Sequence, residues 1–260
     1  MPTLSVTIIT CNESHNIGDC LASVSFADQR VVLDSGSQDA TVGLARSAGA
    51  EVSVTTDWPG FGPQKNRALD LARGQWVLSL DADERVPPEL RAEIEAQIKR
   101  HDGESVAFQI PRLTQFCGVW IRHCGWTPDH VLRLFRRGEA RFSDDLVHES
   151  LRPLDPSLRI VRLRTPLLHY SYPTPNHYWR KLERYSRDWA RQRHAQGQTT
   201  SIARAAASGL NAFLRSYVFR MGFLDGAMGF AVCTMQAQAA FGKYFELYCL
   251  SRQGESDPTP

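Results

Sequence analysis

The sequence predicts an α/β fold, in which helices flank a mostly parallel sheet and a helical extension follows at the C-terminal end. Two observations carry this prediction. In the first 100 residues, short β-branched runs alternate with helical segments, an order typical of parallel strands joined by crossover helices. From residue 176 onward, this alternation gives way to helical periodicity with many basic residues.

The expected strands of the N-terminal part are short, apolar runs that each end at a polar loop. They cover residues 4–10, 30–33, 51–54 and 76–80. The expected helices cover residues 15–26, 40–48, 63–73 and 88–100. Pro87 and Pro88 suit the start of the last helix, because proline is tolerated in a first turn. Ligands of such sheets bind at the carboxyl ends of the strands, so the polar loops there are candidate binding loops.

The middle of the chain has a different pattern. Short apolar runs at 106–110, 130–135 and 159–163 are separated by turns, which predicts a mixed or antiparallel extension of the sheet. We expect a first domain over residues 1–172, a basic amphipathic helical extension over 173–253 and a flexible tail over 254–260.

Composition limits the class of protein. The chain has 260 residues, of which 42% are hydrophobic and 22% charged, and this excludes a disordered or collagen-like protein. Six cysteines occur without a CxxC pair, so we expect free thiols in a reducing cytosol. The N-terminus lacks the features of a signal peptide, and no run of about eighteen apolar residues predicts a membrane span.

The strongest chemical motif is the pair of carboxylates Asp81 and Asp83, directly after the strand at 76–80. Two such carboxylates on one turn can converge on a divalent cation, and their hard oxygens suit Mg²⁺ or Mn²⁺. The alternative is an acidic turn that precedes the helix at 88–100 and is favoured by its dipole.

Two further loops are candidates for binding a nucleotide. Asp34 follows the second strand, and its carboxylate can accept the imide N–H of uracil; a simple helix cap by Asp39 is the alternative. Lys65 and Arg67 stand at the start of the helix at 63–73, where cations and free N–H groups attract phosphate. A plain surface helix is the alternative for that segment.

Four segments of the N-terminal half, 6–13, 32–39, 64–69 and 80–84, together resemble the family 2 glycosyltransferases with the GT-A fold. The resemblance implies that residues 1–100 bind a nucleotide sugar and that residues 101–172 carry the acceptor and base region. It also implies roles for single residues. Thr10, Asn12, Glu13 and Asp34 would hold the base and ribose, Lys65 would face the diphosphate, Asp81 would lie near ribose and metal, and Asp83 would bind the metal.

Segments 133–136, 147–149 and 223–230 resemble the branch with lipopolysaccharide-core β-1,4-glucosyltransferases. That resemblance implies transfer of a hexose to the inner-core saccharide of lipopolysaccharide, with glucose from UDP-glucose as the first choice of donor. The alternatives are another lipid-linked or polysaccharide acceptor, or a nucleotide-sugar-binding protein without turnover. A nucleotidyltransferase is disfavoured, because no glycine-rich loop follows the first strand.

Members of this family invert the anomeric centre in one displacement, which requires a general base for the acceptor hydroxyl. Asp144, Asp145 and Glu149 are the candidates; we prefer Glu149, which lies in the branch motif, and place Asp145 second. His148 is a candidate metal ligand, a partner of Glu149 or a structural histidine.

The C-terminal part is basic and aromatic. Residues 173–220 hold nine Lys and Arg against two acidic residues, with Tyr and Trp interleaved. One interpretation is a platform for an anionic membrane surface, which would place a cytoplasmic protein on the inner face of the cytoplasmic membrane. The other is a solvated arginine face with its apolar stripe packed on the first domain. Nucleic acid is not an expected partner, because no RRM, KH or helix-turn-helix pattern is present.

Overall fold

The structure is a computed structural model that describes residues 2–143 and 150–253. It contains two compact units. The first comprises Met1–Arg112 and Asp129–His169, and the second comprises Leu113–Pro128 and Tyr170–Pro260. The sequence placed residues 113–128 in the first domain, whereas in the structure they group with the C-terminal helices.

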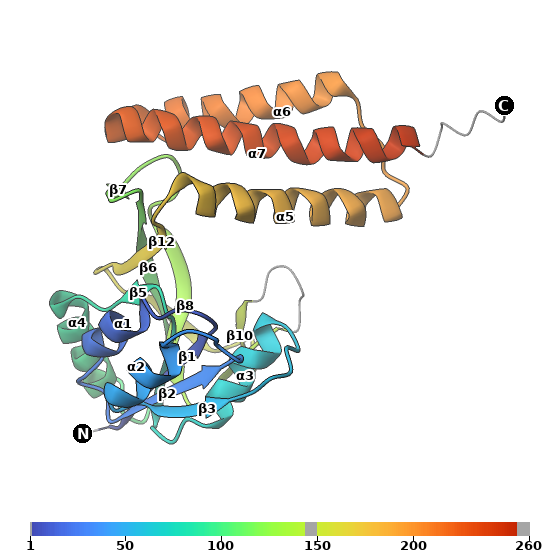
Figure 1. Ribbon diagram of the computed structural model, residues 1–260. Helices are drawn as coiled ribbons and strands as arrows, with labels where there is room; N and C mark the ends of the chain where they lie inside the picture. The colour runs from blue at the N-terminus through green and yellow to red at the C-terminus, as the bar shows by residue number, and fades with distance from the viewer. Residues whose placement is uncertain (1, 144–149, 254–260) are drawn as a thin grey trace. The chain divides into compact units, whose positions relative to one another are not determined.

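The first unit contains the expected alternation of strands and helices (Figure 1). Its parallel strands have the order β3-β2-β1-β4. These strands are β1 (Leu4–Thr10), β2 (Gln29–Asp34), β3 (Glu51–Val54) and β4 (Trp76–Asp81). The helices are α1 (Ile17–Ser23), α2 (Thr41–Ser47), α3 (Phe61–Asp70) and α4 (Pro88–Arg100). The α/β prediction is therefore confirmed, with most element ends within a few residues of the expected ones.

Helices flank both faces of this sheet because successive residues of a strand point to opposite faces. Leu78 of β4 packs in one buried cluster with Leu21 of α1 and Leu90 of α4. Its neighbour Val77 belongs to a second cluster that contains Leu69 of α3. The carboxyl ends of the parallel strands stay uncovered by this packing, and the polar loops are there.

Beyond β4 the sheet becomes mixed, as the sequence predicts. The path continues as β4-β8-β6-β12-β5, with β8 antiparallel to both β4 and β6. These strands are β5 (Glu84–Arg85), β6 (Val106–Phe116), β8 (Asp129–Arg136) and β12 (Leu167–Tyr172). β7 (Val119–Ile121) and β11 (Arg159–Arg162) also pair with β6, and β9 (Ala140–Phe142) pairs with β10 (Leu151–Pro153). The β5–β12 pairing sets His169 opposite Glu84, close to the end of β4.

The second unit is built on three helices. Figure 1 shows them side by side, and α7 packs against both α5 and α6. They are α5 (Pro175–Ala195), α6 (Ile202–Leu214) and α7 (Gly226–Gln253). A π-helical turn (Arg215–Phe219) and a 3₁₀ turn (Gly222–Asp225) join α6 to α7.

Among the described residues, no single helix has the length and apolar composition needed to cross a membrane. One bent pair, Ile202–Phe219 with Gly222–Arg252, meets that test jointly, with 73° between its halves. Large apolar side chains on this pair are exposed to solvent, and Phe219 is the most exposed of them at 79%. They include Leu210, Leu214, Val218, Phe219, Met221, Phe223, Leu224 and Phe230.

Candidate active site

Asp34 organises the first two loops at the carboxyl ends of β1 and β2. Strand pairing sets Thr10 beside Asp34, and the Thr10 hydroxyl donates a 2.9 Å hydrogen bond to Asp34 Oδ2. The backbone N–H groups of Gly36 and Ser37 donate to Oδ1 at 3.0 and 2.8 Å. Ser37 Oγ donates to Oδ2 at 2.5 Å. The buried carboxylate already accepts four hydrogen bonds, so contact with a base would require one hydroxyl to turn away.

Asn12 and Glu13 bind the first loop to the second. Asn12 has the left-handed φ of +57°, which asparagine tolerates better than most residues. Its N–H donates to Ser37 Oγ at 2.8 Å, and its side-chain oxygen accepts from the Gln38 N–H at 2.9 Å. The Glu13 N–H donates to Thr41 Oγ1 at 2.8 Å. The two loops therefore form one cross-linked surface at the sheet edge.

Lys65 and Asp81 form an ion pair at the end of β4, with 2.9 Å between Nζ and Oδ1. Lys65 is only 7% exposed. It reaches this place because the buried Gln64 fixes α3, donating to Ser35 Oγ and Thr55 Oγ1 at 3.1 and 2.8 Å. The expected phosphate-facing lysine thus lies at the strand ends, but it already has a carboxylate partner.

Arg133 contacts the other oxygen of Asp81, at 2.5 Å, and Glu84 Oε1 at 2.7 Å. Glu84 is fully buried, and its Oε2 accepts the backbone N–H of Asp81 at 2.9 Å. Burial alone would raise the pKa of Asp81, but the charges of Arg133 and Lys65 together hold that pKa well below its usual value. Asp81 is therefore a carboxylate in every condition in which the protein is folded near neutrality.

Asp83 lies beside His169, with 3.3 Å between Oδ2 and Nε2. The side chains are 27% and 12% exposed, so both are accessible from the strand-end surface. His169 was not among the residues singled out from the sequence, because a single histidine in a β-strand carries no motif. Across residues 2–143 and 150–253, no group of three or more His, Cys, Asp and Glu side chains is arranged to hold a metal ion.

A carboxylate and an imidazole at this separation suit one divalent cation, whose other positions substrate phosphates commonly fill. Asp83 and His169 therefore fit the expected metal as a two-ligand protein set. The carboxylate of Asp81 fits less well, because each of its oxygens contacts a cationic side chain.

The expected general bases, Glu149 and Asp145, lie outside the described residues, as do Asp144 and His148. The residues on either side are described. The side-chain amide of Asn66 on α3 forms two 2.9 Å hydrogen bonds with the backbone N–H and carbonyl of Phe142. Lys65 Nζ lies 5.1 Å from the centre of the Phe142 ring, and the Ser143 N–H donates to the Ser150 carbonyl at 2.9 Å. Before the segment, Phe142 thus lies next to Lys65, and Ser143 and Ser150 on its two sides are hydrogen-bonded to each other.

The loops after β1, β2 and β4 meet at one edge of the sheet. Asn12 contacts the loop after β2, and the carboxylate of Asp83 is close enough to Glu13 to influence its pKa. Residues 5–150, more than half of the chain, match the family model described as glycosyl transferase family 2. The chain belongs to the family 2 glycosyltransferases.

Relatives along nearly the whole chain agree with this assignment. An uncharacterised glycosyltransferase of Rickettsia prowazekii is 30% identical over 98% of this chain and 90% of its own length. The lipopolysaccharide core biosynthesis glycosyltransferase LpsC of Rhizobium meliloti is 31% identical, over 94% of this chain and 92% of its own. The resemblance to transferases of lipopolysaccharide-core biosynthesis is therefore confirmed.

Solved structures are also similar to this transferase. A glucosyl-3-phosphoglycerate synthase from Mycobacterium tuberculosis, in complex with Mn²⁺, UDP and glucosyl-3-phosphoglycerate, is 27% identical over 44% of each chain, with a TM-score of 0.36. The TarS structure from S. aureus is 15% identical and covers 97% of this chain and 92% of its own, with a TM-score of 0.48.

Proposed function

We propose that this glycosyltransferase moves a hexose, in first place glucose from UDP-glucose, to the inner-core saccharide of lipopolysaccharide. One observation carries the proposal: Asp34 and the Lys65–Asp81 pair both lie at the carboxyl ends of the parallel strands, and α3, which bears Lys65, is hydrogen-bonded to the loop after β2 through Gln64. The similarity to LpsC supports the choice of acceptor.

In this proposal, Thr10, Asn12, Glu13 and Asp34 hold the base and ribose of the donor. Asp34 is already oriented by the N–H groups of its own loop, and it can meet the base once the hydroxyl of Thr10 or Ser37 turns away. The Lys65–Asp81 pair borders the diphosphate, and Asp81 holds both Lys65 and Arg133 in place there. A donor phosphate would share these two cations with Asp81.

We assign the divalent cation, Mg²⁺ or Mn²⁺, to Asp83 and His169, with Asp81 close by. The bound ion would supply positive charge opposite the departing nucleoside diphosphate. The protein's own contribution is to hold the carboxylate of Asp83, in the turn between β4 and β5, beside the imidazole of His169 on β12, through the β5–β12 pairing.

We place Glu149 as the general base and Asp145 as the second candidate. The base takes the proton of the acceptor hydroxyl while that oxygen bonds to the anomeric carbon and the bond to the diphosphate breaks. The contacts of Phe142 with Lys65 and Asn66 support this placement, because they bring the chain next to the donor surface just before Asp145.

We further propose that the transferase works on the inner face of the cytoplasmic membrane. Support comes from exposed arginines on α5 and from the exposed apolar side chains between α6 and α7. Binding to vesicles with anionic lipids should weaken as salt is raised, because exposed charges are screened within about 10 Å at 0.1 M salt. Salt-independent binding, or no binding, would contradict this.

A donor screen with purified lipopolysaccharide acceptors, analysed by mass spectrometry, tests the function. Transfer of one hexose to a truncated inner-core acceptor, with UDP-glucose preferred, is the expected result. Transfer only to a different lipid-linked or polysaccharide acceptor would refute the acceptor, and binding of donors without turnover would refute the transferase activity.

A further inference from the structure

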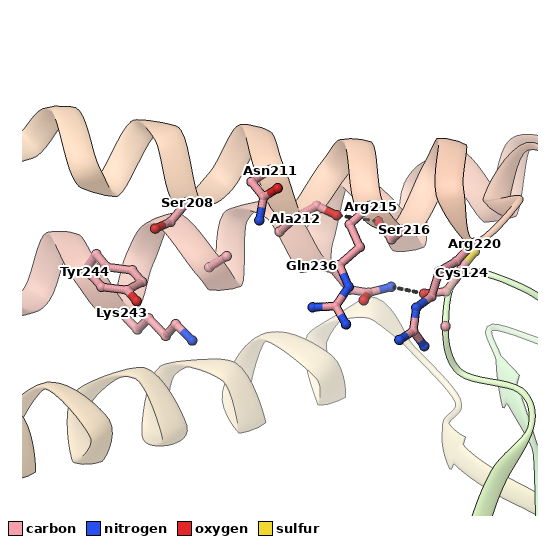
Figure 2. Close-up of a pocket in the computed structure, with 12 residues that line it drawn as sticks. Cys124, Ser208, Asn211, Ala212, Arg215, Ser216, Arg220, Gln236, Lys243 and Tyr244 are labelled. Atoms are coloured by element: carbon pink, nitrogen blue, oxygen red, sulfur yellow. Dashed lines mark hydrogen bonds between the residues drawn. The ribbon is translucent and has the colours of Figure 1, made fainter.

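The second unit contains a hollow of about 450 Å³ that the donor surface does not use. It lies against α6, the π-helical turn and α7, with Cys124 and Gly125 at one end (Figure 2). Three cationic side chains line it, from Arg215, Arg220 and Lys243, and none of its twelve lining residues is acidic.

These cations have no anionic partner in the part of the chain that the structure describes. No ion pair joins Arg215, Arg220 or Lys243 to a carboxylate within residues 2–143 and 150–253. Lys243 Nζ instead lies 5.1 Å from the ring centre of Trp189 and 5.5 Å from that of Tyr244. Figure 2 shows the charged ends of the three side chains directed to the same side of the helix pair. The three positive charges, with no carboxylate in the lining, favour the approach of an anion to the hollow.

The backbone holds Arg220 in this arrangement. Gly125 has a φ of +79°, and a Cβ built on it would lie 2.6 Å from Cδ of Arg220. The Arg220 side chain therefore packs directly against this glycine. The Cys124 N–H donates to the Arg220 carbonyl at 3.2 Å, and Gln236 donates to the Cys124 carbonyl at 3.2 Å. The π-helical turn begins at Arg215, and such turns are frequent at functional sites.

We propose that this hollow binds a phosphate monoester. Guanidinium groups match phosphate oxygens with paired N–H donors, and three positive charges suit a dianion better than a singly charged phosphodiester. The volume exceeds that of a phosphate, and the rest of the lining carries amide and hydroxyl groups, including Asn211, Gln236 and Tyr244. The site therefore has room for the hydroxylated group that bears the phosphate. It is separate from the transfer reaction, and its test needs no turnover.

The test compares vesicles of equal zeta potential that contain either phosphatidic acid, a monoester, or phosphatidylglycerol, a diester, in phosphatidylcholine. We expect the full chain to bind the phosphatidic acid vesicles about tenfold more tightly at physiological ionic strength. Equal binding to the two vesicles would overturn the proposal, because a general basic surface responds only to charge.

Matched variants distinguish binding in the hollow from an effect of the protein's net charge. The triple variant R215Q/R220Q/K243Q should lose the preference for phosphatidic acid. The control R46Q/K99Q/R100Q removes the same amount of charge from exposed positions on α2 and α4, and it should retain the preference for phosphatidic acid. G125A keeps every charge but pushes against Arg220, so it should reduce the preference; circular dichroism checks that each variant is folded. A preference that survives the triple variant would overturn the proposal.

Competition with inorganic phosphate identifies the source of the monoester. If millimolar phosphate removes the preference for phosphatidic acid, the site also binds the free phosphate ion. If that preference resists phosphate but disappears in the triple variant, the site requires the monoester carried by a lipid. Both results support a monoester site. Competition of equal strength by sulfate, an anion that is not a phosphate, would overturn it.

Discussion

Arg133 on β8 places its guanidinium 2.5 Å from the carboxylate of Asp81 at the end of β4. The same nitrogen lies 2.7 Å from Glu84, which is fully buried. One side chain thus joins three segments: β8, the end of β4 and the short β5 strand. Since Lys65 contacts the other Asp81 oxygen, one carboxylate holds both Arg133 and Lys65 at the end of β4.

Replacing Arg133 with methionine should destabilise the protein by about 3 kcal/mol, because the buried Glu84 would keep only the more distant Arg112, at 3.6 Å, as a cationic partner. Urea unfolding measures this loss. Arg141→Ala is the control, since Arg141 pairs with Asp70 at the surface at 2.9 Å with both side chains about half exposed. That pair should contribute about 1 kcal/mol or less. Equal losses in the two variants would show that the network does not stabilise the fold.

Asn66→Ala should lower kcat more than it changes the donor KM. The substitution removes both hydrogen bonds that hold Phe142 to α3, and this contact fixes the chain just before the candidate bases. A stability loss of about 1–3 kcal/mol is expected from the unpaired backbone groups. Gln198→Ala, which removes an exposed amide bonded to Arg193, is the control. A raised donor KM with unchanged kcat would contradict the assigned role.

Asp83→Asn and His169→Ala should each weaken activation by Mn²⁺ by about 100-fold, while the protein remains folded, because both side chains are partly exposed. Calorimetry of UDP binding with and without the metal provides a second measurement. Asp155→Asn, on an exposed turn, is the control. Unchanged metal dependence in both variants would exclude Asp83 and His169 as ligands.

Glu149→Gln should retain donor binding and lose transfer by about 10²–10⁴-fold, the usual contribution of general-base catalysis. Asp145→Asn is the matched comparison, because it neutralises the second candidate in the same segment. Single-turnover transfer rates, measured together with donor affinity, show which of the two carboxylates acts as the base. If Asp145→Asn loses transfer while Glu149→Gln remains active, the base is Asp145.

The pKa of Glu13 is raised above its ordinary value of 4.5, mainly by burial; the hydrogen bond from Asn16 opposes this shift and Asp83 adds to it. A carboxyl group with a raised pKa in the folded state favours folding when protonated. The cost of its charge therefore appears as the pH rises through the folded-state pKa. Glu13→Gln should raise the melting temperature relative to wild type at neutral pH, and the difference should shrink below pH 4.5. A difference that is the same at both pH values would contradict this explanation.

Much of the proposed donor surface could be predicted because local sequence patterns determine it. β-Branched runs that end at polar loops gave β1, β2 and β4, and parallel pairing alone then brings Thr10 next to Asp34. Asp83 and Lys65 were placed at the same edge for the same reason. The amphipathic pattern after residue 176 likewise predicted α5.

The features that could not be predicted depend on contacts between segments that are distant in the sequence. His169 reaches Asp83 only through the pairing of β12 with β5, which no local pattern specifies. Glu84 was not singled out from the sequence, and its buried contact with Arg133 depends on the pairing of β8 with β4. The structure groups Leu113–Pro128 with the C-terminal helices, and β6 extends over Val106–Phe116, beyond the short run expected at 106–110.

Two glycines allow close backbone packing at the junction between α6 and α7. A Cβ at Gly229 would lie 1.9 Å from the Gly222 carbonyl oxygen, and one at Gly222 would lie 2.5 Å from Cys233 Sγ. Backbones packed this closely admit only glycine at these two positions. Beside this turn, Phe219 and Leu224 are 79% and 56% exposed. We expect these exposed apolar side chains to promote self-association of the purified chain, and mild detergents or lipid nanodiscs to suppress it.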